Sequence, residues 1–196
     1  MKAFLALLAF LQTAGVPVER ASLPGPEGTT LRSVTASGLR RQDAIAAAQW
    51  LVARPGTPAG GVALIGWSNG GGTVLATARA GADLPPGLFR RFAAFYPGCA
   101  ATENPAWQPA APLLILVGES DDWTPARPCH DLQARYPRQI TLLGYPGAYH
   151  DFDAPDRPVI LREGAATAPG GKAHAGTNEP ARQDALARVP RWLEGR

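Results

Sequence analysis

The sequence predicts an α/β fold with a mostly parallel sheet and helices on both faces. Short apolar segments alternate along the chain with longer segments in which apolar residues recur at helical spacing. A wholly apolar strand is typical of a parallel sheet that is covered on both faces. With 196 residues, of which 45% are hydrophobic and 18% charged, the chain suits one folded domain, expected over residues 16–196.

Four segments are predicted strands and four are predicted helices. The strands are expected over residues 62–65, 91–97, 112–118 and 139–146. The helices are expected over residues 41–53, 69–79, 125–134 and 178–193. Thr124 is expected to cap the third helix, because threonine followed by proline is a common helix start. A weak strand is expected over residues 29–35, and a loop over residues 150–177.

The first 15 residues have the pattern of a secretory signal peptide. Lys2 precedes an apolar run over residues 3–11, and small residues follow at positions 13–15. The run is too short for a permanent membrane helix, and the alternative is a buried first helix. No other segment of the sequence is apolar enough to cross a membrane. The mature chain is therefore expected to be periplasmic or secreted, without a membrane span.

Export would place the two cysteines, Cys99 and Cys129, in an oxidising compartment. One follows a predicted strand and the other follows the loop after the next strand, so both are expected at the same end of the sheet. They could pair as a disulfide, and the alternative is that both remain free, buried thiols.

Charge and motif content exclude several other classes of protein. The net charge of +3 comes from scattered arginines, since Lys2 and Lys172 are the only lysines. This pattern does not predict a nucleic-acid partner. The sequence has neither a cysteine–histidine spacing typical of zinc sites nor a phosphate-binding loop, so no metal and no cofactor are expected.

Three polar residues, Ser68, Asp121 and His150, each follow a predicted strand. Because the carboxyl ends of parallel strands meet at one edge of a sheet, we expect these side chains to lie close together. A histidine can take the proton of a serine hydroxyl, and a carboxylate behind it stabilises the imidazolium. The order serine, aspartate, histidine suits an α/β-hydrolase sheet. We therefore predict a catalytic triad with Ser68 as nucleophile, His150 as base and Asp121 as acid.

Ser68 lies in the sequence GWSNG, between a predicted strand and a predicted helix. A sharp strand-to-helix turn crowds the backbone, so small residues are expected two positions before and after the nucleophile, at Gly66 and Gly70. The backbone N–H of Asn69 is expected at the helix start, where it could stabilise an oxyanion. The alternative is a glycine-rich turn with an ordinary hydroxyl.

Three blocks of the sequence, GWSNGG, LLILVGESDDWTPARPC and YPGAYHDFDAP, resemble the signature blocks of the dienelactone hydrolase family within the α/β-hydrolases. The resemblance runs from about residue 41 to the C-terminus and implies an α/β-hydrolase fold. Dienelactone hydrolases in the strict sense have cysteine at the position of Ser68, so the serine points to esterase-like members of the family. The implied activity is cleavage of small carboxylic esters or lactones through an acyl-enzyme on Ser68.

Neighbouring acidic residues are less suited to the acid role. Asp122 adjoins Asp121, but Asp121 matches the family turn, three residues after Gly118. Asp151 and Asp153 are close to His150 in sequence and could not easily orient it, so both are expected to be solvated.

Two other histidines and three aromatic residues lie near the predicted triad in sequence. His130 is expected to be a surface or helix-capping residue, and His174 lies in a glycine-rich segment with no predicted strand to position it. The aromatic residues that flank the triad are expected to line an apolar substrate pocket; they are Trp67, Trp123 and Tyr149.

Family members have several strands ahead of the nucleophile strand, and this sequence shows no clear apolar strand before residue 41. The resemblance therefore implies a fold truncated at its N-terminal side, without the loop that supplies a second oxyanion donor. The strand over residues 62–65 would then form an apolar sheet edge, which favours a dimer through that edge. The alternative function is that of a catalytically impaired or non-enzymatic hydrolase-fold protein that binds ligands or partners.

Overall fold

The computed structural model describes residues 38–57, 59–165 and 167–195. The predicted signal peptide over residues 1–15 and the weak strand over residues 29–35 lie outside these described residues. None of the helices in the described part of the chain combines the length and the apolar character that crossing a membrane requires.

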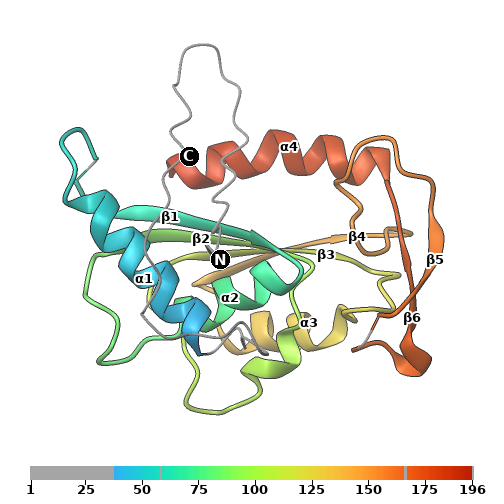
Figure 1. Cartoon of the computed structure of the whole chain (residues 1–196), viewed down its shortest axis with the longest axis horizontal. Coiled ribbons are helices and arrows are strands. Elements are labelled where there is room, and N and C mark those ends of the chain that lie inside the picture. Colours follow the sequence, from blue (N-terminus) through green and yellow to red (C-terminus); the bar gives the residue numbers. More distant parts are fainter. Residues whose placement is uncertain (1–37, 58, 166, 196) are drawn as a thin grey trace, which may run out of the picture. The chain divides into compact units, whose positions relative to one another are not determined.

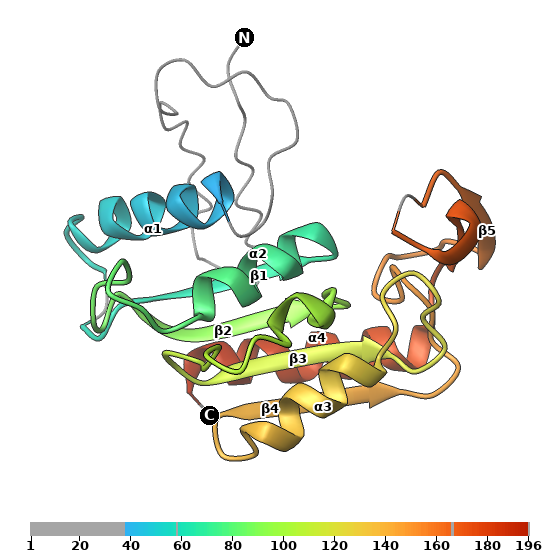
Figure 2. The same cartoon turned by 90° about the horizontal axis from the view of Figure 1, so that it is seen from below.

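Four parallel strands form the main sheet in the order β1-β2-β3-β4 (Figure 2). The strands are β1 Val62–Trp67, β2 Phe89–Phe95, β3 Leu113–Gly118 and β4 Ile140–Tyr145. All six residues of β3 are buried, as expected for a strand covered on both faces. The four predicted strands are confirmed, with bounds that differ by no more than two residues. Among the described residues β1 pairs only with β2, so the predicted dimer through the open side of β1 stays a prediction.

Helices cover both faces of this sheet (Figure 1). Helices α1 Leu39–Val52, α2 Asn69–Ala78 and α3 Arg127–Arg135 lie on one face, and α4 Glu179–Glu194 lies along the other. Alternate residues of β3 serve the two faces, because successive side chains of a strand point in opposite directions. Ile115 packs in the core under the first three helices, whereas Leu114 and Leu116 pack with Ala185 of α4. The predicted α/β architecture is therefore confirmed.

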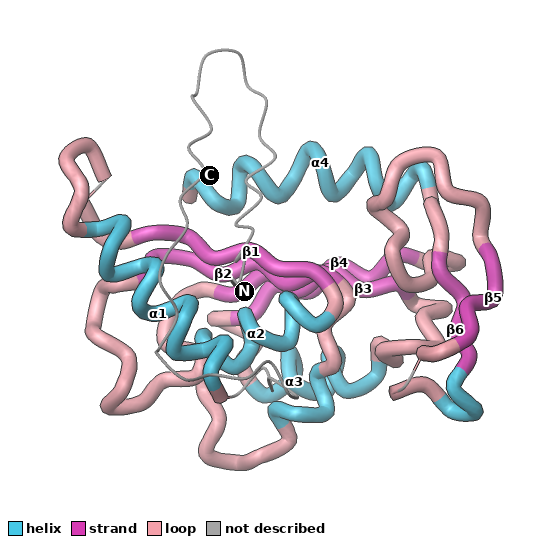
Figure 3. Tube along the Cα trace, viewed as in Figure 1, coloured by secondary structure: helices cyan, strands magenta, loops and turns pink. Residues whose placement is uncertain are grey.

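The prediction of a loop over residues 150–177 was wrong. Strands β5 Ile160–Glu163 and β6 Lys172–Ala175 form an antiparallel hairpin, with a short 3-10 helix, η2 Pro169–Gly171, just before β6. The hairpin lies beyond the carboxyl ends of β3 and β4 (Figure 3). The sequence of β5, Ile-Leu-Arg-Glu, does not alternate between apolar and polar residues, which is the pattern by which strands are recognised. Most of its residues are exposed.

A disulfide joins Cys99, in the 3-10 helix η1 Cys99–Thr102, to Cys129 of α3, with the two Cα atoms 5.1 Å apart. Of the two alternatives that the sequence leaves open, the structure has the paired one. The bond links the segment after β2 to the segment after β3. It therefore ties together two of the loops at the carboxyl edge of the sheet.

Arg41 fastens α1 to the C-terminal end of α2. Its side chain is almost fully buried and donates hydrogen bonds to the carbonyl oxygens of Ala76, Thr77 and Arg79. Such carbonyl groups lack partners within a helix. The guanidinium also contacts both carboxylate oxygens of Asp83, at 2.8 and 2.9 Å, and this hydrogen bonding lowers the pKa of Asp83.

Replacing Arg41 by methionine is expected to lower the free energy of unfolding by about 2–3 kcal/mol, because buried carbonyl oxygens lose their donors. Arg40→Met removes the neighbouring charge and is expected to change the free energy of unfolding by less than about 0.5 kcal/mol. Urea unfolding followed by circular dichroism measures both values. Equal losses in the two variants would show that Arg41 does not cap α2.

Candidate active site

Ser68 occupies the tight turn between β1 and α2. Its backbone has φ 50° and ψ −116°, a conformation that non-glycine residues rarely adopt. The N–H of Ser68 donates to the carbonyl oxygen of Phe95 in β2 at 3.0 Å, and its own carbonyl accepts from Gly72 at 2.9 Å. The neighbouring strand and the first turn of α2 therefore hold the strained turn that presents the hydroxyl.

The crowding around this turn falls on Gly66 and Gly71. A Cβ atom added at Gly66 would run into the carbonyl group of Gly70, and one added at Gly71 would lie 2.8 Å from the carbonyl oxygen of Phe95. The prediction that Gly70 must be small was wrong. A Cβ atom there would meet no atom within 4 Å outside its own helix, because it would point into open space.

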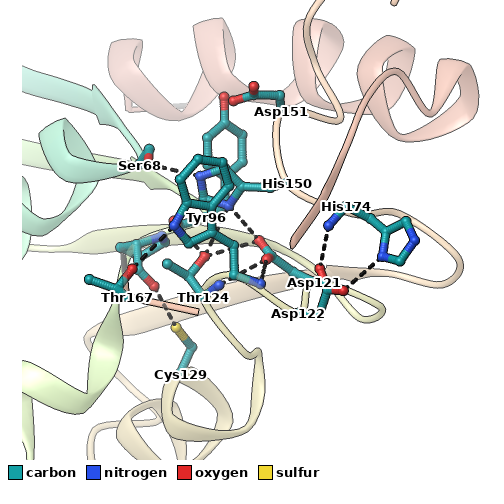
Figure 4. Close-up of polar contacts among 12 residues, drawn as sticks. Ser68, Tyr96, Asp121, Asp122, Thr124, Cys129, His150, Asp151, Thr167 and His174 are labelled. Carbon is teal, nitrogen blue, oxygen red and sulfur yellow. Dashed lines mark hydrogen bonds and ion pairs between the residues drawn. The ribbon is translucent and has the colours of Figure 1, made fainter. Parts of the chain in front are cut away.

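His150 lies between Ser68 and Asp121 (Figure 4). Its Nε2 is 2.8 Å from Ser68 Oγ, and its Nδ1 is 2.8 Å from Asp121 Oδ2. Both distances are those of good hydrogen bonds. The side chain of His150 is 2% exposed and that of Asp121 is fully buried. The structure thus brings together the three side chains that the sequence analysis predicts as nucleophile, base and acid.

Hydrogen bonds fix the Asp121 carboxylate in its orientation. Oδ1 accepts from the backbone N–H groups of Trp123 and Thr124, at 2.8 and 2.9 Å, which leaves Oδ2 facing His150. The Thr124 hydroxyl lies 3.0 Å from Oδ2 and 3.1 Å from the carbonyl oxygen of Tyr96. The prediction that Thr124 caps α3 was wrong. Ala126 occupies the cap position, and the Thr124 hydroxyl lies at the Asp121 carboxylate instead.

The imidazole of His150 is held between two aromatic rings. The Tyr96 ring centroid lies 4.5 Å from it on one side, and the Trp123 centroid lies 4.7 Å from it. Rings packed this closely restrict rotation of the imidazole away from Ser68 and Asp121. Tyr96 itself has a positive φ of 35°, so the backbone is strained at a second residue that contacts the triad.

Asp153 anchors two of the residues around the triad, and the prediction that it is solvated was wrong. Its carboxylate accepts from the Tyr96 hydroxyl at 2.8 Å and from Trp67 Nε1 at 2.7 Å. Burial raises the pKa of Asp153, and these two hydrogen bonds only partly oppose that effect. Burial also raises the pKa of Tyr96, so its hydroxyl stays protonated and remains a donor. Asp151, also predicted to be solvated, is partly buried and contacts Arg162 at 3.3 Å.

Asp153→Leu is expected to lower the free energy of unfolding by about 2–5 kcal/mol, because two donors lose their acceptor. Asp153→Asn is expected to lower the free energy of unfolding by less than about 1.5 kcal/mol. The amide oxygen can accept from Trp67, and the amide nitrogen can donate to the Tyr96 oxygen. Chemical unfolding of both variants gives the two values. A leucine variant as stable as the asparagine variant would contradict the anchoring role.

The β5–β6 hairpin supports the backbone of His150. The N–H of Gly176 donates to the carbonyl oxygen of His150 at 2.9 Å, and Ala175 at the end of β6 forms an isolated bridge with His150. The N–H of Asn178 then donates to the carbonyl oxygen of Phe152 at 3.0 Å. Sequence reasoning missed this support. The alternation of Lys172–Ala175, after two glycines, is the signal that could have indicated a short strand.

Asn69 is the first residue of α2 and directly follows Ser68. The N–H of a first helical residue has no acceptor within its helix, so it is free to donate to a bound oxyanion. The described residues ahead of β1 form α1 and contain no strand. A second donor from a loop after an earlier strand is therefore not identified among the described residues.

The three aromatic residues predicted to line the substrate pocket have different surroundings. Trp123 contacts His150 and donates to Thr167 Oγ1 at 3.1 Å. Trp67 stacks on Phe95, with ring centroids 5.2 Å apart, and the Tyr149 ring packs at a tilt against the ring of His174. Of the three, Trp123 is the one whose ring contacts the ring of His150, and the pocket itself stays a prediction.

The two remaining histidines each pair with one carboxylate. His130 lies on α3 and its Nε2 is 2.9 Å from Glu119, while His174 lies in β6 and its Nδ1 is 2.8 Å from Asp122. The prediction that no strand positions His174 was therefore wrong. Within the described part of the chain, no group of three or more histidine, cysteine, aspartate or glutamate residues is arranged to hold a metal ion.

A model of the dienelactone hydrolase family matches residues 28–195. The chain belongs to this family. The match covers the nucleophile turn, the acid turn and the segment that carries His150, which are the blocks on which the resemblance rests. No curated protein matches the chain closely enough to count as a relative.

Solved structures share the fold of this family member. A protein of Klebsiella pneumoniae described as a dienelactone hydrolase superimposes with a TM-score of 0.60 at 19% identity, over 82% of this chain and 62% of its own. A dienelactone hydrolase-like promiscuous phosphotriesterase from metagenomic libraries gives a TM-score of 0.55 at 23% identity, over 80% and 61%. A protein of Agrobacterium tumefaciens of unknown function, described as an α/β hydrolase, gives a TM-score of 0.57 at 16% identity, over 86% of this chain and 67% of its own. The chain thus spans about three fifths of the first two structures.

Proposed function

We propose that this protein is a serine hydrolase that cleaves small carboxylic esters or lactones through an acyl-enzyme on Ser68. The observation that carries the proposal is the continuous chain of hydrogen bonds from Ser68 Oγ through His150 to Asp121, with both contacts at 2.8 Å. Family membership supports hydrolysis as the reaction type. A serine rather than a cysteine at the turn supports ordinary esters and lactones as the substrate class.

In the proposed reaction, His150 Nε2 takes the hydroxyl proton as Ser68 Oγ attacks the ester carbonyl carbon. The backbone N–H of Asn69 donates to the oxyanion that forms. The protonated imidazole then gives its proton to the leaving alkoxide, and the acyl group stays on Ser68. A water molecule, deprotonated by His150, attacks the acyl carbon. The bond between that carbon and Ser68 Oγ then breaks, His150 returns the proton to Ser68 Oγ, and the acid is released. Asp121 stabilises the imidazolium in both steps.

The test is hydrolysis of p-nitrophenyl acetate by the purified protein, with and without a fluorophosphonate, a reagent that phosphonylates activated serines. We expect hydrolysis above the buffer rate and its time-dependent loss once the reagent is added. Hydrolysis that the reagent leaves unchanged would contradict a serine nucleophile. No hydrolysis and no reaction with the reagent would favour the alternative, a hydrolase-fold protein that only binds ligands.

We also propose that the protein is exported to the periplasm or secreted. The Cys99–Cys129 disulfide supports this location, because disulfides form and persist mainly in oxidising compartments. Free-thiol counting under denaturing, non-reducing conditions tests the pairing. Two free thiols in the protein recovered from the periplasm or medium would contradict it.

A further inference from the structure

A second aspartate–histidine pair lies beside the triad (Figure 4). Asp122 directly follows the proposed acid, Asp121. Its Oδ2 is 2.8 Å from His174 Nδ1, and its Oδ1 accepts the backbone N–H of His174 at 2.8 Å. Burial raises the pKa of Asp122, but the hydrogen bonds from His174 outweigh it and hold the pKa below its usual value. Both oxygens of one carboxylate therefore hold a single residue of β6.

This residue of β6 is connected to the base. Ala175, the next residue, forms the isolated bridge with His150, and Gly176 donates its N–H to the His150 carbonyl oxygen at 2.9 Å. The His174 ring also packs against the ring of Tyr149, the residue before His150, with centroids 5.0 Å apart and the rings tilted by 35°. His174 is therefore linked to the backbone of His150 through the two residues that follow it, and to the residue before His150 through the ring of Tyr149.

Asp121 and His150 come from the loops after two different strands, β3 and β4. The Asp122–His174 contact is a further connection between the segments that follow these two strands, in addition to the Asp121–His150 contact. The two side chains of the pair are 43% and 41% exposed. An exposed ion pair of this kind contributes little to overall stability, so the effect of the contact is expected in local geometry.

We propose that Asp122 and His174 are positioning residues that fix the β5–β6 hairpin to the acid loop and thereby keep His150 in line with Ser68 and Asp121. The effect of the Asp122–His174 contact on turnover rests on the proposed function. The effect on the geometry of His150 does not, because the hydrogen bond between His150 and Asp121 can be observed without a substrate.

Two substitutions at His174 separate its ring from its hydrogen bond. His174→Asn retains a side-chain N–H donor close to the position of Nδ1, whereas His174→Phe retains a ring that can pack against Tyr149 and loses the donor. Asp122→Ala removes the contact from the other side without adding a bulky group. His130→Phe is the matched control, because His130 also pairs with one carboxylate, that of Glu119, and its side chain is 44% exposed.

The first readout is the low-field proton NMR signal of the His150 Nδ1–H that is shared with Asp121. We expect the signal in the wild type, in His130→Phe and in His174→Asn, and its loss or broadening in His174→Phe and Asp122→Ala. The second readout is steady-state hydrolysis of p-nitrophenyl acetate. We expect kcat to fall about tenfold or more in His174→Phe and Asp122→Ala, with KM within about twofold, since small misplacements of a catalytic group are costly.

His174→Phe and Asp122→Ala variants with the wild-type signal and the wild-type kcat would overturn the proposal. A fall in kcat that His130→Phe shows to the same degree would also overturn it. If the wild type hydrolyses no ester, the proposed function fails, and the NMR signal alone decides the positioning role. Loss of the signal in both variants then supports that role, and its retention overturns it.

Discussion

Ser68→Ala is expected to reduce kcat for p-nitrophenyl acetate by at least about 10³-fold, because no acyl-enzyme can form without the hydroxyl. The His150–Asp121 contact at 2.8 Å does not depend on the serine, so the variant is expected to keep the fold and the stability of the wild type. The activity that remains would come from the Asn69 N–H and from binding alone.

Ser120→Ala is the matched control for this substitution. Ser120 lies next to Asp121, and the contact that holds it is a backbone one, from its N–H to the carbonyl oxygen of Ala148 at 3.0 Å. The kcat of Ser120→Ala is expected to stay within about twofold of that of the wild type, since removal of a single hydroxyl away from the core usually has a small effect. Equal rates in the wild type and Ser68→Ala would refute the enzymatic function and favour the binding protein.

Gly66→Ala is expected to lower the free energy of unfolding by about 3 kcal/mol or more, a large effect for one methyl group. The added Cβ would meet the carbonyl group of Gly70 and the side chain of Val74, which lies 3.0 Å away. Backbone atoms cannot rotate out of the way as side chains can, so the turn that carries Ser68 has to move. Turnover is expected to fall together with stability.

Gly70→Ala is the control for Gly66→Ala, because it adds the same methyl group four residues later at an open position. It is expected to leave stability unchanged or to raise it by up to about 1 kcal/mol, since alanine favours the helix more than glycine does. Thermal and urea unfolding of the two variants give the comparison. A Gly70→Ala variant that is destabilised as much as Gly66→Ala would show that the crowding is not localised as described.

The main sheet and the meeting of Ser68, Asp121 and His150 at its edge could be predicted from the sequence, because their signals are local and ordered. The wholly apolar run of β3 identifies a strand covered on both faces, and Asp121 follows it within three residues. Ser68 and His150 likewise follow β1 and β4. Parallel strands deliver their carboxyl ends to one edge, so the order along the chain was enough to bring these residues together.

The contacts around Ser68, Asp121 and His150 could not be predicted, because they depend on segments far apart in sequence. Asp153 lies only three residues from His150, yet its donors come from Trp67 and Tyr96 on two other strands or their ends. His174 reaches Asp122 across 52 positions through a hairpin whose outer strand is mostly exposed. No periodicity of a single segment carries such information.

The wrong predictions about Thr124 and Gly70 have a common cause. Both followed a general motif, the threonine–proline helix start and the small residue after the nucleophile. In this structure the Thr124 hydroxyl is engaged with Asp121 and the carbonyl oxygen of Tyr96. The close approach to β2 occurs one residue later than the motif indicates, at Gly71. The motif around Ser68 predicts a sharp strand-to-helix turn, but the position of β2 determines that Gly71 is the crowded residue.

The central claim is that Ser68 is a nucleophile activated by His150, and mass spectrometry of a fluorophosphonate adduct tests it most directly. After the wild-type protein is treated and digested, we predict the added mass on the peptide that contains Ser68, at Ser68 itself. Ser68→Ala is expected to carry no adduct, and His150→Ala is expected to react at least about 10²-fold more slowly, since general-base assistance is worth about 10²–10⁴. An adduct at another residue, or a His150→Ala variant that reacts as fast as the wild type, would contradict the account.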